Sequence, residues 1–384
     1  MQTSLSAQSY SQLLGQDDLN AITTAVPFLL IAPDSRAGSM GDIGVSTSPD
    51  ANSQHWNAAK YAFIEDKMGF SVSYSPWLRN LVPDISLAYL TGYYRINNMS
   101  TVSASLRYFS LGLIEFTDKF GNSQGEYKPN EFAIDAAYSR KLGDNISGSV
   151  TLRYINSNLT QGQNVGGQAT QVGQSVATDV GVYYTKKIKI KKTKGRFAFG
   201  VNVSNIGAKI SYSESLERDF IPMNFRIGPS LTLDLDKYNQ ITMAIDINKL
   251  LVPTPPIYAQ DSVGNPIPDG NGYKIDKGMD PNRSVGNAIF SSWYDAPNGM
   301  SEEMREFYIG GGLEYVYDKK FFLRGGYFYE HATKGNRKYF TLGAGFKYNV
   351  LALDISYLIP TTQRNPMEKT LRFTLLFNFN DTEK

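Results

Sequence analysis

The stretch LRFTLLFNF, from Leu371 to Phe379, alternates between apolar and polar side chains. Leucine or phenylalanine occupies every odd position, whereas Arg372, Thr374 and Asn378 occupy even positions. Because successive side chains of a β-strand point to opposite faces, the pattern predicts a strand with one apolar and one polar face. Soluble β-sandwiches and membrane barrels both use such strands, so the rest of the chain has to distinguish them.

The composition narrows the class of protein. The chain has 384 residues, and its 38 Lys and Arg against 36 Asp and Glu give a net charge of +2. That near-balance does not favour a nucleic-acid-binding protein or a polybasic membrane binder. The absence of cysteine excludes disulfides, cysteine-bound zinc and cysteine nucleophiles. Aromatic residues make up 13% of the chain, and those near Phe379 suit the interfacial girdle of a membrane barrel.

The apolar runs are too short for a membrane helix, which needs about 18 consecutive apolar residues. The best run, AVPFLLIA at Ala25–Ala32, also contains Pro27. The mean hydropathy of −0.31 is compatible with a barrel, because strands around a watery lumen are polar at every second position. The sequence starts without the basic and apolar pattern of an export signal. We therefore expect either that export is not involved or that the signal has been removed.

From Lys67 onward, segments with the length and alternation of tilted transmembrane strands recur. Fourteen are predicted, at Met68–Ser75, Ile85–Tyr94, Thr101–Leu111, Phe132–Arg140, Ile146–Asn156, Val176–Lys186, Arg196–Ile206, Phe225–Asp236, Gln240–Asn248, Glu306–Tyr317, Phe321–Glu330, Tyr339–Tyr348, Leu351–Ile359 and Leu371–Phe379.

The connections between these segments are alternately short and long. Tight turns such as INNM at 96–99 and KYN at 237–239 alternate with loops such as SNLTQGQNVGGQATQVGQS. Outer-membrane barrels have this alternation, with both termini on the short-turn side, whereas Greek-key sandwiches lack it. We predict an all-β, 14-stranded antiparallel barrel in the outer membrane of a Gram-negative bacterium. LRFTLLFNF is then its closing strand, with the apolar face toward lipid and Arg372, Thr374 and Asn378 toward the lumen.

Two regions lie outside the strand pattern. Residues 1–66 contain no transmembrane strand, and the lumen of a 14-stranded barrel is wide enough to hold them. We predict a plug or hatch at 1–66 and a barrel at 67–384, with a long outer loop at 250–305. Loops of that length are usually functional. The loop aromatics, Phe290, Trp293 and Tyr294, are of types enriched at protein interfaces, so they either bind a partner or pack the loop onto the barrel mouth.

The run KKIKIKKTK, at Lys186–Lys194, falls on the short-turn side and is strongly basic. One interpretation is a hairpin that extends beyond the membrane with a solvated, charged face. The other is a docking site for an acidic partner or for phosphate headgroups. The sequence leaves both open.

The segment DSRAGSMGDIGVSTSPDANSQHWNAAKYAF, Asp34–Phe63, resembles the N-terminal hatch of the FadL-like barrels, in which fourteen strands surround that hatch. Together with AVPFLLIAPDSRAGSMGD and YSPWLRNLVPDISLAYLTGYY, it resembles more narrowly the PorV family of the type IX secretion system. In this hatch we expect Arg36 and Asp42 to make polar contacts with the lumen wall. The FadL-like motif Asn-Pro-Ala is Asn57-Ala58-Ala59 here, and the missing proline puts in doubt any hydrophobic-solute path that requires a rigid hatch.

The resemblance implies a function and partners. Such a barrel collects secreted proteins from the giant translocon barrel by binding their C-terminal signal domain. It then carries them to a sortase-containing attachment complex at the cell surface. Outer-membrane lipid or lipopolysaccharide is a further expected partner, and nucleic acid is not. The alternatives are a FadL-like transporter of hydrophobic solutes and an outer-membrane lipid A deacylase.

Catalytic residues are scarce. A Ser-His-Asp site needs a histidine oriented by an acid and close to a hydroxyl, and the chain has two histidines, His55 and His331. Glu330 is a local acid for His331, but we expect His331 to be a polar loop residue and His55 to pack inside the plug. The sequence has no His-x-x-x-His spacing. We expect no enzymatic activity, no cofactor and no metal.

Overall fold

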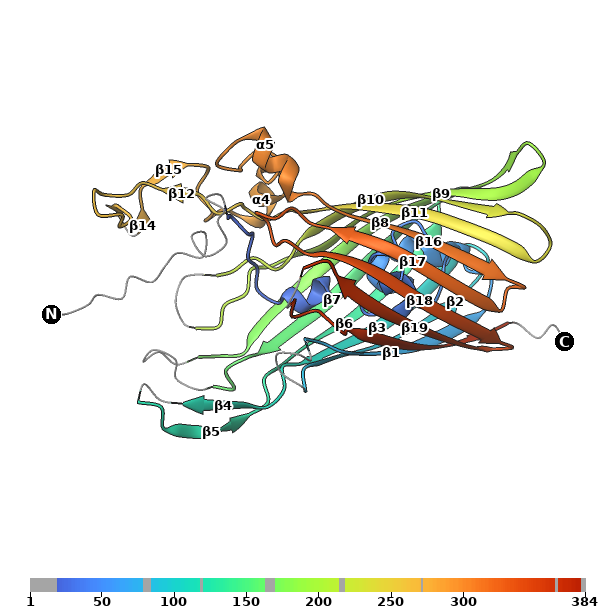
Figure 1. Ribbon diagram of the computed structural model, residues 1–384, viewed down its shortest axis with the longest axis horizontal. Coiled ribbons are helices and arrows are strands. Elements are labelled where there is room, and N and C mark those ends of the chain that lie inside the picture. The colour runs from blue at the N-terminus through green and yellow to red at the C-terminus, as the bar shows by residue number, and fades with distance from the viewer. Residues whose placement is uncertain are drawn as a thin grey trace.

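The computed structural model describes residues 19–78, 84–117, 120–162, 170–213, 218–270, 272–362 and 365–380. Fourteen strands form one closed antiparallel barrel, as predicted, and each predicted segment overlaps one strand (Figure 1). The strands are β1 (Met68–Pro76), β2 (Ser86–Arg95), β3 (Ser100–Ser110), β6 (Asn130–Lys141), β7 (Ile146–Asn158), β8 (Gly173–Ile190), β9 (Thr193–Gly207), β10 (Asn224–Asp234), β11 (Asn239–Leu250), β16 (Tyr308–Tyr317), β17 (Phe321–Tyr329), β18 (Lys338–Tyr348), β19 (Leu351–Pro360) and β20 (Leu371–Phe379).

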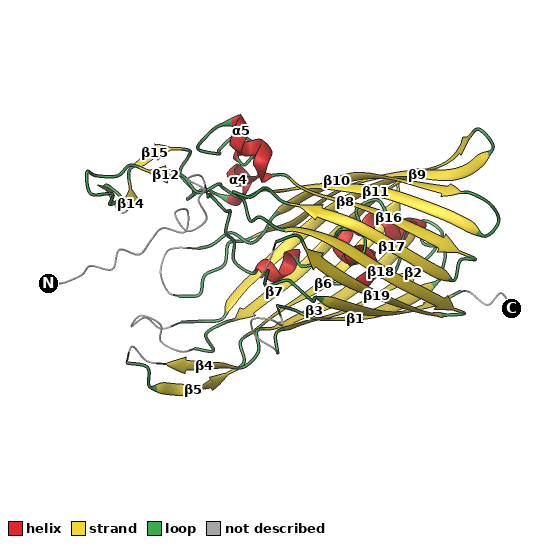
Figure 2. Ribbon diagram, in the orientation of Figure 1, coloured by secondary structure: helices red, strands yellow, loops and turns green. Residues whose placement is uncertain are grey.

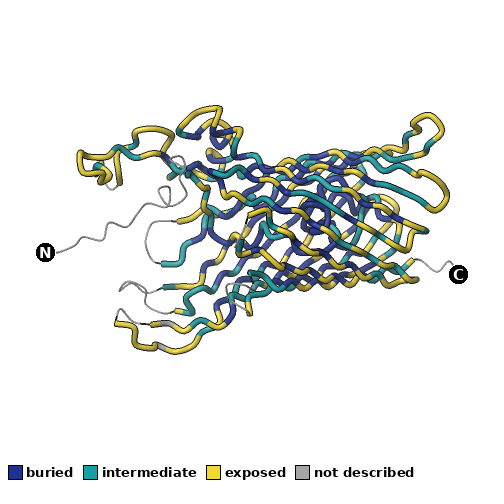
Figure 3. The backbone as a smooth tube through the Cα atoms, in the orientation of Figure 1, coloured by how far each residue is buried: buried dark blue, intermediate teal, exposed yellow. Residues whose placement is uncertain are grey.

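The closing strand has the two faces that its sequence predicts. β20 pairs with β1, from Met68 opposite Phe379 to Tyr74 opposite Phe373, and this pairing closes the barrel. Arg372 is buried on the inner face, whereas Phe373 points outward and is 40% exposed. The same alternation of buried and exposed positions runs around the barrel wall (Figure 3). A closed barrel leaves no free strand edge within its wall.

The connections are short at one end of the barrel and long at the other (Figure 2). One long connection forms a hairpin of β4 (Ile114–Thr117) and β5 (Ser123–Tyr127). The longest connection, residues 251–307, forms a compact region that we call the cap. Its elements are β12 (Ile257–Tyr258), β13 (Pro268–Asp269), β14 (Gly272–Tyr273), β15 (Ile275–Lys277), α4 (Val285–Ser291), α5 (Met300–Glu303) and η3 (Met304–Glu306).

Residues 19–66, which we call the inner segment, start at the barrel mouth and run into the lumen, where their short helices lie (Figure 2). The segment contains four short helices, η1 (Pro27–Leu30), α2 (Ser35–Gly38), α3 (Ser53–Trp56) and η2 (Ala58–Phe63). Tyr61 of η2 is fully buried and packs with Tyr93 of β2 and Leu376 of β20. Among the described residues, no helix has the length and apolar character needed to cross a membrane.

The path of the inner segment bears on the expectation that both termini lie on the short-turn side. The described chain begins at the long-loop end, where the Asn20 amide donates to the Thr333 carbonyl in the β17–β18 loop at 3.0 Å. It reaches the short-turn end at Lys67, whose amide donates to the carbonyl of Phe379 at 3.0 Å. The expectation holds for the barrel strands themselves. The inner segment runs through the lumen before β1 begins, and the N-terminus itself, in residues 1–18, lies outside the described residues.

A band of glycines lets the inner segment approach the barrel wall closely. Gly310 and Gly312 of β16 and Gly326 of β17 face the backbone of Met40 and Gly41. A Cβ atom on Gly312 would lie 2.4 Å from the Met40 carbonyl oxygen, and one on Gly326 would lie 2.1 Å from the Met40 carbonyl carbon. Only residues without a side chain fit here, so the GGG sequence marks a packing contact.

Candidate functional site

Arg36, which we expected to contact the lumen wall, joins the inner segment to β16. Its Nε and Nη2 atoms donate to Glu314 at 3.1 and 2.9 Å, and its Nη1 atom donates to Asp50 at 2.8 Å. Glu314 also accepts from Arg324 of β17 at 2.7 Å, and Arg324 bonds Asp354 of β19 at 2.5 Å. These five residues, the inner cluster, are largely buried. Two planar guanidinium groups share one carboxylate, so the inner segment is held in place both by directional hydrogen bonds and by charge attraction.

Asp42 and Asn57 also contact the wall. Tyr339 of β18 donates its hydroxyl proton to Asp42 at 2.5 Å, and Arg372 of β20 lies 3.4 Å from the other oxygen of the same carboxylate. The Asn57 side chain donates to the Val182 carbonyl of β8 at 2.9 Å and accepts from the Ala59 amide at 3.1 Å. Asn57 therefore caps η2 and bonds the wall, at the turn where FadL-like barrels have proline.

The cap is held to the barrel mouth by a second buried group of charges, the mouth cluster. Lys249 of β11 lies 2.9 Å from Glu303 and 2.5 Å from Glu306, and Lys334 lies 2.5 Å from Glu302 and 3.0 Å from Glu306. All five side chains are at most 4% exposed. Buried lysines need such counter-charges, because an unpaired ammonium group in a low-dielectric site is costly.

The inner segment also contacts the mouth cluster. The Asn20 side chain donates to Glu302 at 3.0 Å and to the Pro255 carbonyl at 3.0 Å. Burial alone would raise the pKa of Glu302, but hydrogen bonds from Lys334 and from the Asn298 amide outweigh it and keep the pKa below its ordinary value. This cluster was not predicted from the sequence. The one signal was the acidic spacing Glu302, Glu303 and Glu306, which places two carboxylates on one side of a helical turn.

The three aromatic residues proposed from the sequence as partner-binding occupy two different environments. Trp293 lies against the barrel rim, with its ring centroid 5.5 Å from that of Phe225 and 6.2 Å from that of Phe307. Phe290 and Tyr294 are 74% and 59% exposed. Met300 and Met304 are two further exposed apolar residues of the cap, at 67% and 63%. We call the exposed four the cap face.

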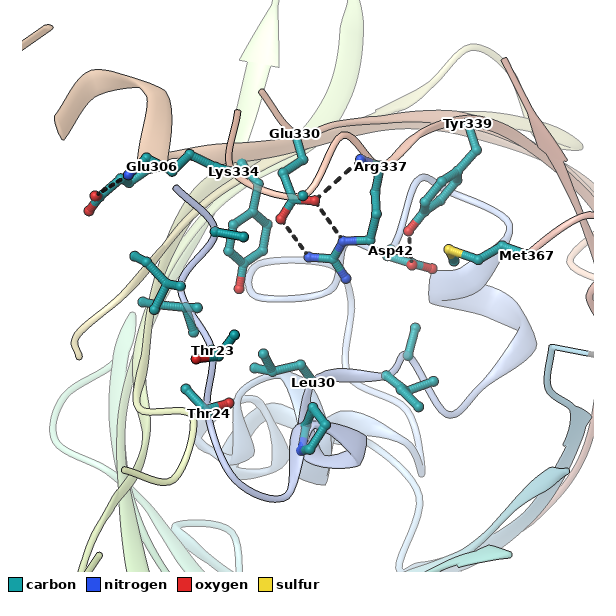
Figure 4. Close-up of a pocket in the computed structure, with 18 of the residues that line it drawn as sticks. Thr23, Thr24, Leu30, Asp42, Glu306, Glu330, Lys334, Arg337, Tyr339 and Met367 are labelled. Carbon is teal, nitrogen blue, oxygen red and sulfur yellow. Dashed lines mark hydrogen bonds and ion pairs between the residues drawn. The ribbon is translucent and has the colours of Figure 1, made fainter. Parts of the chain in front are cut away.

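A cavity of about 380 Å³ lies beneath the cap, between the start of the inner segment and the barrel rim (Figure 4). Arg337 and Glu330 form a doubly hydrogen-bonded pair on one side of it, with Nε and Nη2 each 2.8 Å from a carboxylate oxygen. Apolar side chains such as Leu30 and Met367 line other parts of it, together with polar and charged ones such as Asp42 and Lys334. The cavity therefore has a mixed polar and apolar lining.

The histidines do not form a catalytic arrangement. Glu330 bonds Arg337, while His331 Nδ1 lies 3.0 Å from the Thr333 hydroxyl within the same turn. Burial, with Arg305, Lys338 and Lys334 nearby, lowers the pKa of His331. His55 is buried inside the barrel, with Nδ1 2.6 Å from Arg107. Within the described ranges, no group of three or more metal-ligating side chains comes together.

Comparison with solved structures returns distant barrels. The Ralstonia pickettii toluene transporter TbuX aligns with 92% of this chain and 100% of its own, at 10% identity and a TM-score of 0.47. The Pseudomonas putida toluene transporter TodX aligns with 94% of this chain and 98% of its own, at 11% identity and a TM-score of 0.44. A Pseudomonas aeruginosa FadL homologue aligns with 94% and 100%, at 10% identity and a TM-score of 0.42. Such distant similarity indicates no substrate for this chain.

Comparison of the sequence itself is more specific. No curated protein matches the chain. A family model described as Type IX secretion system protein PorV matches residues 14–257, more than half of the sequence. The matched region includes the inner segment and the strands up to β11. The chain therefore belongs to the PorV family of type IX secretion system proteins, and it is a 14-stranded outer-membrane β-barrel.

Proposed function

We propose that this barrel binds the C-terminal signal domain of secreted proteins at the giant translocon barrel of the type IX system. It then carries them to the sortase-containing attachment complex at the cell surface. Membership of the PorV family supports a role in that secretion system. The specific task is the one that the resemblance implies, and the outer surface of the molecule supports recognition of a protein.

The inner segment favours recognition outside the lumen. Arg36, Asp42 and Asn57 each bond the wall, and the glycines of β16 and β17 leave no space for side chains opposite Met40. A folded β domain does not fit through a lumen occupied in this way. Cargo contact therefore belongs to the outer loops, of which the cap is the longest.

The observation that carries the proposal is an apolar cap face on a firmly held cap. Phe290, Tyr294, Met300 and Met304 are exposed, and the mouth cluster holds the cap beneath them. Exposed aromatic and methionine side chains are typical of the centres of protein interfaces. A preorganised surface loses less conformational entropy on binding than a mobile loop does. In this arrangement Trp293 anchors the cap, and Phe290 and Tyr294 contact the partner.

Affinity purification of the protein from its native outer membrane tests the proposal. The protein is isolated in mild detergent, and bound proteins are identified by mass spectrometry. Secreted proteins that share one C-terminal β domain, together with a very large barrel or a sortase, are the expected partners. Recovery of lipid or fatty acid without any of these proteins would contradict the proposal.

Transport of hydrophobic solutes is the second candidate, and the cavity at the mouth favours it. The volume of that cavity suits a small molecule, and Leu30, Ile31 and Met367 make part of its lining apolar. A deletion strain separates the two functions. Normal fatty-acid uptake with failed surface display of secreted proteins supports the cargo function, and the reverse supports transport.

Because Glu330 is held by Arg337, a deacylase based on His331 gains no support, and His331→Ala is expected to leave lipid A acylation unchanged.

A further inference from the structure

The β8–β9 hairpin extends past the start of β7 at the short-turn end, and β10 runs beside β9 as far as Lys194 (Figure 1). β7 begins at Ile146, which pairs with Tyr184 of β8, yet β8 continues to Ile190 and pairs there with Thr193 of β9. At about 3.3 Å per residue, the six residues 185–190 add roughly 20 Å beyond the last pair with β7. The strand was predicted to end at Lys186, and the basic run continues it instead.

The extension concentrates positive charge. Six of the 38 Lys and Arg lie within residues 186–194, and without these six the net charge of +2 would be −4. No ion pair within the described residues joins any of the six to a carboxylate. Moreover, Lys187 lies opposite Arg196 and Lys189 opposite Lys194 in the strand register. Like charges directly opposite each other destabilise a strand pair, so the free hairpin is less stable than an anion-bound one.

A cavity of about 500 Å³ lies at the base of the hairpin. Three cations line it, Lys187, Lys194 and Arg196, against one carboxylate, Asp234. Asp234 is opposite Lys194 on β10 and accepts a hydrogen bond from the Gln240 side chain at 2.7 Å. The cavity thus keeps an excess of positive charge beside the like-charged pairs.

The backbone of the extension also has an open edge. The Thr185 amide donates to the Asn145 carbonyl at 2.8 Å, so the backbone groups of Thr185 face the β7 side. In an antiparallel strand every second residue faces the same side, so Lys187 and Lys189 also present their N–H and C=O groups there. β7 does not reach these two residues. They form a short strand edge with lysine side chains beside it.

We propose that the β8–β9 hairpin is the docking site for an acidic, extended segment of a periplasmic protein. The segment adds as a strand to the open edge at Lys187 and Lys189, and its carboxylates lie beside Lys187, Lys189, Lys194 and Arg196. Backbone pairing supplies affinity, and charge supplies specificity. Lysines at an edge repel neutral or basic strands and other copies of this hairpin. The open backbone edge and the reach of the hairpin beyond the membrane favour a protein strand over lipid headgroups.

Binding of a defined peptide tests the charge requirement. The probe is a fluorescent octapeptide of alternating Glu and Val, titrated by anisotropy against the full-length barrel in a neutral detergent. The variant Lys187→Gln/Lys189→Gln/Lys194→Gln is expected to weaken binding by about tenfold or more. The matched control, Lys319→Gln/Lys320→Gln/Lys347→Gln, removes three charges at other short turns and should bind as the wild type does. Heat-shifted gel mobility verifies that each barrel is folded.

Two single variants test the backbone edge separately. Lys189→Pro removes the charge and the outward N–H group, whereas Lys189→Gln removes the charge alone; proline is tolerated at an edge whose N–H has no partner. Weaker peptide binding by the proline variant than by the glutamine variant is the expected result. Equal binding by the two overturns strand addition. Failure of the peptide to bind overturns the proposal, as does hairpin-dependent binding to phosphatidylglycerol vesicles in its place.

Discussion

The inner cluster and the mouth cluster have similar chemistry but join different parts of the molecule. In the inner cluster, Arg36 shares Glu314 with Arg324, so the inner segment is bonded to strands of the closed wall. In the mouth cluster, Lys249 and Lys334 share Glu306, which belongs to the cap. In both clusters the paired charges are shielded from water. In the inner cluster, every wall residue that holds the inner segment lies on a regular strand. In the mouth cluster, Lys334 lies in a loop.

This difference indicates that the two clusters stabilise separable units. Strands of the barrel are hydrogen-bonded to both neighbours, and loss of an inner contact strains a cooperative structure. The cap contacts the barrel at its mouth and holds its own helices and hairpins, so it can be released while the wall stays intact. The variants below separate these two units.

Arg36→Met is expected to have the largest effect. It leaves Asp50 without its cation and leaves Glu314 with Arg324 alone, in a site with little solvent. Removing one partner of a buried ion pair typically costs about 3–5 kcal/mol. Urea unfolding of the barrel in detergent measures the loss. Arg36→Met/Glu314→Gln/Asp50→Asn should recover part of it, and an unchanged unfolding free energy in the single variant would contradict this role.

Lys249→Met should release the cap but change the barrel little. Glu303 would then lose its cation, and Glu306 would keep only Lys334, which favours a cap displaced into water. Limited proteolysis should cleave residues 251–307 several-fold faster, with the urea midpoint of the barrel closer to the wild-type value than in Arg36→Met. Lys277→Met, which removes an exposed cap lysine, is the matched control. Equal cleavage of the two variants would show that the mouth cluster does not hold the cap.

Gly312→Ala tests how tightly the segment contacts the wall. The added Cβ would lie 2.4 Å from a backbone oxygen of Met40, so the segment or β16 has to move, at a typical cost of about 1–3 kcal/mol for overpacking. Gly311→Ala is the control on the adjacent residue, where a Cβ would meet no atom within 4 Å. Urea unfolding compares the two. Similar stabilities of the two variants would mean that the inner segment moves away from β16 without loss of unfolding free energy.

The smallest expected effect concerns Asp295 and pH. Burial, together with Glu303 and Glu306, raises the pKa of Asp295 from 3.8 to about 6. A carboxyl whose pKa is higher in the docked cap than in the released cap favours docking most at pH below 4, and this contribution is lost as pH rises to 6. Wild-type cap should therefore be cleaved faster at pH 7.5 than at pH 5. Asp295→Asn should remove most of that difference in cleavage rate. If the difference persists in this variant, other titratable groups cause it.

The strand plan could be predicted from the sequence because it is a local property. Alternation such as that of Leu371–Phe379 fixes which residues face lipid, and the regular change of loop length fixes the barrel topology. The predicted strand ended at Lys186 because consecutive lysines at 186 and 187 interrupt the apolar alternation, although an extended hairpin was one interpretation of the basic run. Its backbone stays in register with β9 all the same.

The site contacts were harder to predict because they join residues far apart in the sequence. Lys249 and Glu306 are 57 residues apart, and Arg36 and Glu314 are 278 apart, so neither partner is visible from local sequence. The route of the inner segment was missed for the same reason. Trp293 could not be distinguished from Phe290 and Tyr294 by residue type, since only its contact with Phe225 shows that it lies on the rim.

Direct binding of a cargo signal domain to the cap face tests the central claim most directly. The barrel is placed in lipid nanodiscs and titrated with a purified C-terminal signal domain from a secreted protein. The account predicts that Phe290→Ala/Tyr294→Ala weakens binding by about tenfold or more, whereas Phe120→Ala, at an exposed aromatic on the β4–β5 hairpin, does not. Equal affinity of wild type and the double variant would contradict recognition through the cap.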